Sequence, residues 1–365
     1  MDSMKFVSEL KDFKEKTVLV RVDFNVENSD DAFRLRASLP TIKFLLDGGA
    51  KVLLMSHRGR PKGKVMREFS LKPMLEFLQK NANPNTLFFD TFDFVAIKKT
   101  INAAPAGSLF LLENIRFLAG EESCDMALAT QLADLGQIYV NDQIAVSHRS
   151  SATITVLPTL LPAYCGFLLH AEMKNLSQVM VNPKQPLVVI VGGGKAVDKF
   201  AVIKNLHDTA SAFLIGGVLA NTCLKAKGVD VGSSLVDAEI LDEVKQHLTD
   251  PKVHLPIDWI TGDGKIFDLG PKSIAMFTDV IKSAGTVIWS GPVGFFEDPR
   301  YFAGSKAIAQ AVVASSAFSV VGGSETTQVI TQLGLEHKIS FVSTGGSAML
   351  DFLAGKQLPG LTALN

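Results

Sequence analysis

The sequence has 365 residues and a formal net charge of −1, with 47% hydrophobic and 20% charged residues. A chain of this length predicts about two domains, and the apolar share is typical of globular proteins with large cores. The near-zero net charge does not favour broad electrostatic binding of nucleic acid or of an anionic membrane. Three cysteines without a C-x-x-C pair do not indicate a disulfide framework or a zinc site.

The first residues, MDSMKFVSELKDF, lack the basic head and apolar core of a signal peptide. No apolar run approaches the roughly 20 residues that a helix needs to span a bilayer. We therefore expect a cytoplasmic protein with neither a nucleic-acid nor a membrane partner.

Short apolar runs alternate with longer amphipathic stretches, which is typical of parallel sheets with crossover helices. In the first half, candidate strands lie within 17–25, 50–59, 108–116 and 137–144, and candidate helices within 38–49 and 71–81. In the second half, candidate strands lie within 186–194, 211–217, 286–294, 318–324 and 339–346, with a candidate helix over 198–210. This alternation predicts an α/β fold with two doubly wound parallel-sheet (Rossmann-like) lobes.

A helical pattern between residues 157 and 186 marks the expected boundary between the lobes. Prolines precede this pattern, and Pro183 and Pro186 follow it before the next strand. We therefore expect one helix to serve as a hinge between the lobes, with a deep cleft between them.

The two halves carry different residues where the strands end, which is where open parallel sheets bind ligands. In the first half these are charged and amide side chains: Arg21, Asp23, Asn25, His57, Arg60, Glu113, Asn114, Arg116, Asn141, Asp142, His148 and Arg149. In the second half they are mostly glycines: Gly192, Gly193, Gly194, Gly216, Gly217, Gly291, Gly294, Gly322, Gly323, Gly345 and Gly346. Eight of the nine arginines precede residue 150 (Arg21, Arg34, Arg36, Arg58, Arg60, Arg67, Arg116 and Arg149).

This asymmetry indicates two kinds of anion site. Arginine binds phosphate or carboxylate with two parallel hydrogen bonds, so the first half is suited to a small, strongly anionic substrate. Glycine lets backbone N–H groups approach a polyphosphate at a helix start. Together the two halves suggest phosphoryl transfer across a cleft, with Arg34 and Lys199 neutralising charge on the moving group.

Each of these sequence features alone is weaker evidence for an anion site than all of them together. A glycine pair after a strand is more often a turn than a phosphate site, and the stretch VGGGKAVDK matches neither the P-loop nor G-x-G-x-x-G. His148 beside Arg149 is equally well explained as a structural histidine. Around Glu325, the residues SVVGGSETT suggest a loop in which Gly322 and Gly323 open the backbone to phosphate and Thr326 caps the next helix.

Ten stretches, in order and over nearly the whole chain, together resemble the phosphoglycerate kinase family. They are RVDFNV, SHRGRP, LLENIRF and VNDQIAVSHR, then GGGKAVDKF, IGGVLANTCLKA, DLGP, WSGPVGFFE, VVGGSET and VSTGGSA. The resemblance implies reversible transfer of a phosphoryl group between 1,3-bisphosphoglycerate and ADP, giving 3-phosphoglycerate and Mg-ATP. It also implies a monomer with a substrate lobe over 1–165, a linking helix over 166–185, a nucleotide-binding lobe over 186–345 and a segment over 346–365 that returns to the first lobe.

The resemblance also implies roles for residues at matching positions. The residues expected to contact phosphoglycerate are Asp23, Asn25, Arg34, His57, Arg60, Arg116 and Arg149, with Arg34 stabilising the transferring phosphoryl group. Lys195 and Lys199 are expected at the nucleotide phosphates, and Glu297 at the ribose hydroxyls. Gly216, Gly217 and Pro292 are expected to wall the adenosine pocket, and the remaining nucleotide-binding residues are Gly193, Gly194, Gly322, Gly323, Ser324, Glu325 and Thr326. Glu325 is the expected Mg²⁺ ligand.

Several positions depart from the family pattern. Glu325 stands where the family has aspartate, and Ser324 stands where it has glycine. The segment HRSSAT lacks a second histidine, and Gln143, Val218 and Ser290 are further replacements. Mg²⁺ requires near-octahedral geometry with ligands at about 2.0–2.1 Å. The extra methylene of Glu325 therefore matters for placing its carboxylate on the metal.

Two hypotheses remain open at this point. The first is an active kinase whose metal and phosphate loop is repacked. The second is a catalytically impaired paralogue that binds nucleotide or phosphoglycerate. Retention of the arginines, Lys195 and Lys199 favours the first, since a binding protein has no physical reason to keep mutually repelling cations. A dinucleotide-dependent oxidoreductase would need G-x-G-x-x-G, and the sequence has none.

Overall fold

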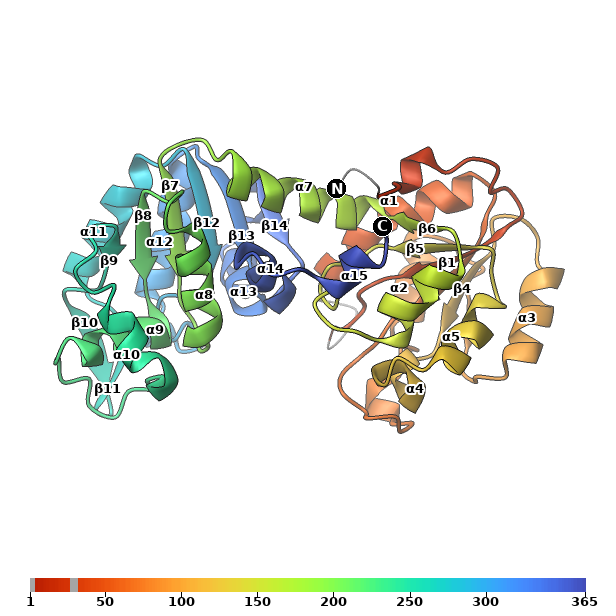
Figure 1. Ribbon diagram of the computed structural model, residues 1–365, viewed down its shortest axis with the longest axis horizontal. Helices are drawn as coiled ribbons and strands as arrows, with labels where there is room; N and C mark the ends of the chain where they lie inside the picture. The colour runs from red at the N-terminus through yellow and green to blue at the C-terminus, as the bar shows by residue number, and fades with distance from the viewer. Residues whose placement is uncertain (1–3, 27–31) are drawn as a thin grey trace. The chain divides into compact units, whose positions relative to one another are not determined.

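A computed structural model describes residues 4–26 and 32–365 and shows two compact units (Figure 1). The first unit comprises the chain up to Met173 together with Gln357–Asn365, and the second comprises Lys174–Lys356. The boundary falls within one helix, α7 (Phe167–Val181). The predicted fold class, two α/β units that each contain a parallel sheet, is confirmed.

The first unit is built on a six-stranded sheet in the order β3-β4-β2-β1-β5-β6. The strands are β1 (Thr17–Arg21), β2 (Lys51–Met55), β3 (Leu87–Phe89), β4 (Leu109–Leu112), β5 (Ile138–Asn141) and β6 (Ala163–Cys165), and all their pairings are parallel. All residues of β1, β4 and β5 are buried. This is expected for a parallel sheet that is covered by helices on both faces. The carboxyl ends of the strands therefore meet at one edge of the sheet.

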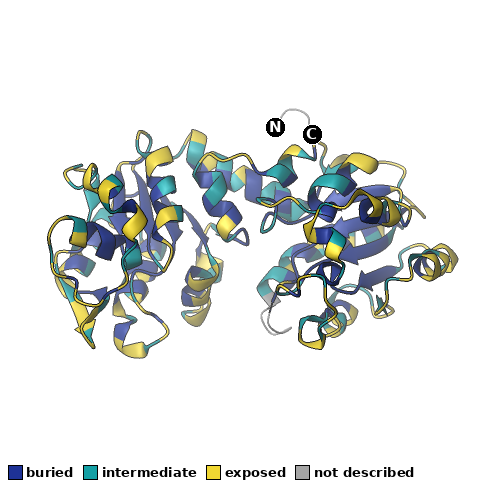
Figure 2. Ribbon diagram, turned by 60° about the horizontal axis from the view of Figure 1, so that its bottom comes forward, coloured by how far each residue is buried: buried dark blue, intermediate teal, exposed yellow. Residues whose placement is uncertain are grey.

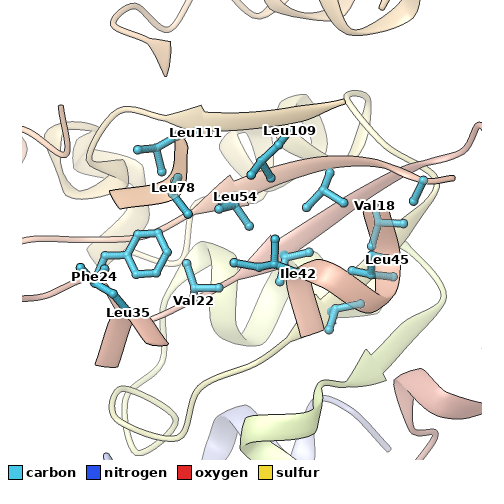
Figure 3. Packing of buried hydrophobic residues seen from close by; sticks show 14 of the residues in the cluster. Val18, Val22, Phe24, Leu35, Ile42, Leu45, Leu54, Leu78, Leu109 and Leu111 are labelled. Carbon is cyan, nitrogen blue, oxygen red and sulfur yellow. The ribbon is translucent and has the colours of Figure 1, made fainter. Parts of the chain in front are cut away.

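The helices of the first unit connect these strands. They are α1 (Ala32–Asp47), α2 (Met74–Asn81), α3 (Phe94–Ala103), α4 (Ala119–Glu122), α5 (Met126–Ala133), α6 (Leu157–Leu160), the first part of α7, and α15 (Pro359–Thr362). Short 3₁₀ turns cover Val7–Glu9, Arg67–Phe69 and Ile115–Phe117, and a π-helical turn covers Ala152–Val156. Leu35, Ile42 and Leu45 of α1 pack on Val18 and Leu54 of the sheet (Figure 3).

The second unit has a six-stranded sheet in the order β14-β13-β12-β7-β8-β9. The strands are β7 (Leu187–Val191), β8 (Ala212–Ile215), β9 (Val253–His254), β12 (Thr286–Ser290), β13 (Phe318–Gly322) and β14 (Phe341–Ser343), again all parallel. Renumbered within the sheet, this is the doubly wound order 3-2-1-4-5-6. Such sheets bind ligands where the order reverses, which here is between β7 and β12.

The helices of the second unit follow the same alternation. They are the second part of α7, α8 (Ala196–Leu206), α9 (Gly217–Ala226), α10 (Leu241–Lys245), α11 (Pro271–Lys282), α12 (Ala303–Ala314), α13 (Ser324–Gln332) and α14 (Ser347–Leu353). Further 3₁₀ turns cover Ala238–Ile240, Pro299–Tyr301 and Glu336–Lys338. Two strands that were not anticipated, β10 (Trp259–Gly262) and β11 (Lys265–Leu269), form a separate antiparallel hairpin.

Within each unit, buried residues gather along the sheet and exposed residues on the outer sides of the helices (Figure 2). The last segment of the chain packs on the first unit, where the Gly360 N–H donates to the Ser147 carbonyl at 2.9 Å. Leu358 and Leu364 are buried there. In the described parts of the chain, no helix combines the length and apolar character needed to cross a membrane.

Candidate functional site

Arg34 and Asp23 meet at the end of β1. The Arg34 Nη1 atom donates to Asp23 Oδ2 at 2.9 Å, and the Asn25 N–H donates to Asp23 Oδ1 at 3.1 Å. The Asn25 side chain accepts from the Gly59 N–H at 2.9 Å, which ties the loop after β1 to the loop after β2. Asp23 is buried, so its carboxylate orients the partly exposed guanidinium of Arg34.

His57 lies buried at the end of β2 among arginines. Its Nδ1 atom is 3.3 Å from Arg21 Nη2. Because arginine can only donate, Nδ1 is the acceptor. Burial, and then Arg21, Arg116, Arg34 and Arg149 in that order, lower the pKa of His57 well below 6.5. The imidazole is therefore neutral, and the structure brings four arginines around it.

The other predicted arginines of this unit differ in exposure. Arg116 is buried: its Nη1 atom donates to the Gly59 carbonyl at 2.9 Å, and its Nε atom lies 3.4 Å from Glu122. Burial, followed by Arg21, lowers the pKa of Arg116 to about 10, so the group stays charged at neutral pH. Arg149 is exposed and donates to His148 at 3.1 Å, while Arg60 is exposed beside Gly59.

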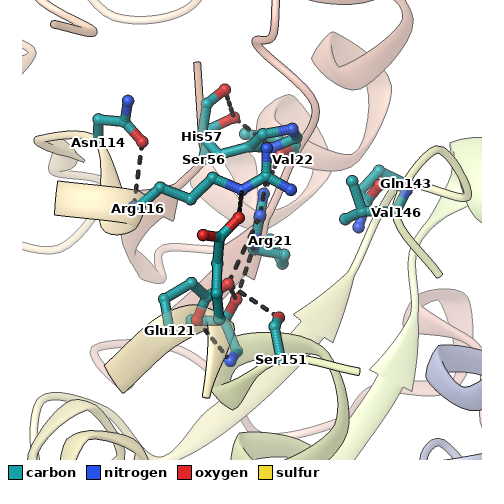
Figure 4. A network of polar contacts seen from close by, with 12 residues as sticks. Arg21, Val22, Ser56, His57, Asn114, Arg116, Glu121, Gln143, Val146 and Ser151 are labelled. Carbon is teal, nitrogen blue, oxygen red and sulfur yellow. Dashed lines mark hydrogen bonds and ion pairs between the residues drawn. The ribbon is translucent and has the colours of Figure 1, made fainter. Parts of the chain in front are cut away.

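Residues that were not predicted to belong to this site hold Arg21 in place (Figure 4). Arg21 is 1% exposed and donates from Nε to the Thr153 hydroxyl at 3.0 Å. The same hydroxyl donates to Glu121 at 2.6 Å. Glu121 belongs to the short helix α4 rather than to a strand end, so the strand-end pattern gave no signal for it.

In the second unit, a pocket of about 350 Å³ opens where the strand order reverses. Six of the predicted nucleotide-binding residues line it: Gly193, Gly194, Gly217, Pro292, Glu297 and Glu325. They come from the loops after β7, β8, β12 and β13. The pocket therefore collects residues that are widely separated in the sequence.

Much of the pocket wall was missed by the sequence reasoning. Its apolar residues include Val218 and Leu224 of α9, Trp259 and Phe267 of the hairpin, and Val293. Phe267 stacks on Tyr301 with ring centroids 4.6 Å apart, which supports the hairpin side of the wall. Trp259 is only partly buried beside the pocket, and sequence alone does not reveal this environment.

The glycines around the pocket fall into two groups. A Cβ on Gly192, Gly217 or Gly291 would collide with backbone atoms of a neighbouring loop, so these glycines allow the loops to pack against each other. Gly216 likewise faces Val293, and Gly322 faces the Met349 sulfur, which makes its role one of packing. A Cβ on Gly194 would meet nothing within 4 Å. Open backbone of this kind suits a phosphate.

Lys199 is buried near Glu325 and Lys195, the acid and the other lysine of the predicted phosphate site. It lies on the first turns of α8 and is only 7% exposed, and Lys195 is the residue before this helix. Burial lowers the pKa of Lys199, whereas Glu325 and Asp198 act in the opposite direction. Among the described residues, Lys199 has no hydrogen-bond or ion-pair partner, an unfavourable arrangement for a buried cation unless an anion joins it.

The loop after β13 differs from the expectation at Thr326. Helix α13 begins at Ser324 and is preceded by Gly323, so Thr326 lies inside the helix and the prediction that it caps the start is wrong. Its buried hydroxyl accepts from the Gly291 N–H at 2.7 Å and ties this loop to the loop after β12. The positive φ of 97° falls on Gly323, so Ser324 occupies ordinary helical backbone without strain.

Comparison with known proteins gives consistent results. Residues 7–356 match the sequence model of the family described as Phosphoglycerate kinase. A phosphoglycerate kinase of Herpetosiphon aurantiacus is 42% identical, with 96% of each chain covered. One of Desulforapulum autotrophicum is 40% identical, over 99% of this chain and 100% of the relative.

Solved structures are similar over the same extent. The phosphoglycerate kinase of Coxiella burnetii has a TM-score of 0.84 and 34% sequence identity. That of Pyrococcus horikoshii has a TM-score of 0.87 and 29% identity. Each comparison covers 99% of this chain and 98% of the other.

Proposed function

The chain belongs to the phosphoglycerate kinase family, and from this premise we propose which of its residues bind each reactant. Its activity is the phosphoryl transfer of that family, with a carboxyl group as acceptor. The proposed reactants are 3-phosphoglycerate and ATP in one direction, and 1,3-bisphosphoglycerate and ADP in the other. Similarity to kinases over the full length does not favour the alternative of a binding protein without activity.

The observation that carries the nucleotide assignment is the pocket between the loops after β7 and β12. Its apolar wall suits a purine base, and Glu297 at its rim supplies a carboxylate that can accept hydrogen bonds from two ribose hydroxyls. Gly194 and Glu325 also line the pocket. We assign the phosphates to these residues because Gly194 leaves its backbone open and α8 begins directly beyond it.

Lys195 and Lys199 would neutralise the phosphate oxygens. Lys199 is a buried residue without a hydrogen-bond or ion-pair partner among the described residues, so a phosphate oxygen would supply the anion. In a site that excludes water this interaction is stronger than on an open surface. Ser324 and the N–H groups at the start of α13 add further donors beside Gly323.

Glu325 is the residue proposed to hold Mg²⁺. Its carboxylate lines the pocket beside Gly193 and near Lys199, so an oxygen ligand is present where the phosphates are placed. In the described part of the chain no group of three or more His, Cys, Asp or Glu residues forms a metal cage. This fits Mg²⁺, which is commonly held by one or two carboxylates together with substrate phosphates and water. When bound, Mg²⁺ neutralises charge on the phosphates.

Phosphoglycerate is assigned to the carboxyl end of the first sheet. Arg34, Arg116 and Arg149 act electrostatically on the same buried histidine, His57, so their charges converge there. Asp23 and Asn25 shape the loop through hydrogen bonds, and Arg60 lies at its exposed side. A ligand with both a phosphate and a carboxylate matches this excess of guanidinium groups.

The reaction needs no covalent enzyme intermediate and no proton transfer. A carboxylate oxygen of 3-phosphoglycerate forms a bond to the γ-phosphorus of ATP, the bond from that phosphorus to the β–γ bridging oxygen breaks, and ADP leaves. Arg34, held by Asp23, would stabilise negative charge on the transferring group, as would Lys199. Positioning and charge neutralisation therefore account for the rate.

A coupled assay of the purified protein with 3-phosphoglycerate and Mg-ATP tests this proposal. Arg34→Ala should lower kcat at least a hundredfold, the usual effect of losing one transition-state donor. Arg300→Ala is the matched control, because Arg300 is an exposed arginine paired with Asp298 in the second unit. Wild-type protein that binds ATP but turns over no faster than Arg34→Ala would contradict the kinase assignment.

Two further expectations belong to this proposal, a cytoplasmic location and a monomeric state. Both rest on the sequence and on the family. Sedimentation velocity at several protein concentrations tests the second, and a concentration-dependent shift to a larger species would contradict it.

A further inference from the structure

Glu121 is a buried carboxylate with three hydrogen-bond donors from one short segment. The Ser151 hydroxyl donates to Oε1 at 2.9 Å, the Thr153 N–H to Oε2 at 2.9 Å, and the Thr153 hydroxyl to Oε1 at 2.6 Å. This segment directly follows Arg149, in the HRSSAT stretch that lacks the second histidine. Glu121 is only 1% exposed, so it is shielded from solvent.

The hydrogen-bond network of Glu121 extends to Arg21 and His57 (Figure 4). The Thr153 hydroxyl accepts from Arg21 Nε at 3.0 Å, and Arg21 Nη2 lies 3.9 Å from Glu121 and 3.3 Å from His57. One carboxylate thereby links the backbone after Arg149 to the end of β1 and to His57. The link runs through direct hydrogen bonds between the side chains of Glu121, Thr153, Arg21 and His57.

The segment is also fixed on its other side. The Tyr139 hydroxyl on β5 donates to the Thr153 carbonyl at 2.7 Å. Thr153 lies in the π-helical turn Ala152–Val156, a rare conformation whose first N–H groups need partners outside the turn. Glu121 provides the partner for the Thr153 N–H.

We propose that Glu121 is a positioning residue of the phosphoglycerate site, acting through Ser151 and Thr153 on Arg149 and Arg21. This inference rests on the assignment of phosphoglycerate to the first unit. Simple electrostatics argues in the opposite direction, because a carboxylate close to an anion site repels the anion. The two effects therefore differ in sign: removing the charge tightens phosphoglycerate binding if Glu121 is only a nearby charge, and weakens it if Glu121 orients the arginines.

The test uses four single variants of the full chain and the double variant Glu121→Gln/Thr153→Val. Glu121→Gln removes the charge, Thr153→Val removes the bridging hydroxyl and keeps the charge, and Thr153→Ser keeps the hydroxyl. Asp93→Ala is the stability control, because Asp93 caps α3 in the same unit and contacts none of these residues. For each variant, calorimetry measures the dissociation constants for phosphoglycerate and for ADP, and the coupled assay measures KM and kcat.

Glu121→Gln and Thr153→Val should each weaken phosphoglycerate binding about tenfold, in both the dissociation constant and KM, as expected for one lost hydrogen bond to a charged group. ADP binding should change less than about twofold, and Thr153→Ser should bind phosphoglycerate nearly as wild type does. In the double variant the two changes should be far from additive, since both break one network. Asp93→Ala should lower stability without altering either dissociation constant.

Unchanged or tighter phosphoglycerate binding by Glu121→Gln would overturn the inference. So would a pattern like that of Asp93→Ala, in which only stability falls. If Glu121→Gln does not fold, Thr153→Val and Thr153→Ser give the same decision. Failure of the wild-type protein to bind phosphoglycerate would instead contradict the proposed function.

Discussion

The carboxylate of Glu325, on the first turn of α13, reaches back to Gly193 in the loop after β7. A Cβ placed on Gly193 would lie 2.9 Å from Glu325 Oε2, and Gly193 has a φ of 72°. The longer acid thus lies where the loops after β7 and β13 approach each other at the end of the pocket. An aspartate in its place would withdraw the carboxylate from Gly193.

Glu325→Asp is expected to change the dependence of ADP binding on Mg²⁺. Because the surrounding loops are packed around the longer side chain, we expect about a tenfold higher Mg²⁺ concentration at half-saturation. Calorimetric titration of ADP at a series of Mg²⁺ concentrations measures this. Glu239→Gln, an exposed acid in the same unit, is the control. An unaltered Mg²⁺ dependence would remove the metal assignment.

Gly192→Ala is expected to lower stability, whereas Gly194→Ala is expected to weaken ADP binding. The first places a methyl group against the Pro292 carbonyl oxygen, so it should lower the free energy of unfolding by about 2 kcal/mol. The second points into open space and should change stability by less than about 0.5 kcal/mol while weakening ADP binding. Urea denaturation and ADP calorimetry on both variants separate the two effects. Equal losses of stability would contradict the distinction.

Lys199→Met is expected to stabilise the free protein while it removes activity. Methionine fills a similar volume without a buried charge, so the gain in free energy of unfolding should be on the order of 1 kcal/mol. The loss of phosphate neutralisation should lower kcat at least a hundredfold. Thermal unfolding without nucleotide and the coupled assay provide the two measurements. A less stable variant would show that Lys199 already has a compensating partner in the free protein.

His57 should make stability depend on pH below neutrality. Its pKa in the folded protein lies well below 6.5, because of burial and the four arginines, whereas the unfolded chain takes up a proton near 6.5. The unfolded state then binds more protons, so this contribution to stability is present above pH 6.5 and is lost as the pH falls below it.

Wild type should therefore lose stability more steeply than His57→Gln between pH 6.5 and 5, by up to about 1.4 kcal/mol per pH unit. Urea denaturation at several pH values compares the slopes. Parallel slopes for the two proteins would mean that His57 is protonated in the folded state.

The sequence predicted the long parallel strands well, because buried strands such as β1 and β7 read as continuous apolar runs. It did not predict β3 and β6, which have three residues each and show no usable periodicity. The β10–β11 hairpin was also missed, since β10 has no buried residue and the register of the hairpin shifts after Ile260.

The candidate site was predictable to the extent that it follows strand ends. Topology places those ends at one edge, so Asp23 and His57 could be proposed from their positions alone, whereas Arg34 lies on α1 and the role of Glu325 was implied by the family resemblance. Glu121 could not, because it acts from α4 on a segment that only folding brings near. Nor does sequence distinguish Gly192 from Gly194, which share one run of three glycines but have a crowded and an open environment.

The contact of Gly360 with Ser147 makes the first unit discontinuous along the chain. During synthesis, all of Lys174–Lys356 must leave the ribosome before Leu358 and Leu364 can cover the segment next to Arg149. The second unit, Lys174–Lys356, is contiguous along the chain, so it can complete its own core without waiting for the last residues. The proposed phosphoglycerate site is therefore finished late in translation, after all residues of the pocket in the second unit have been made.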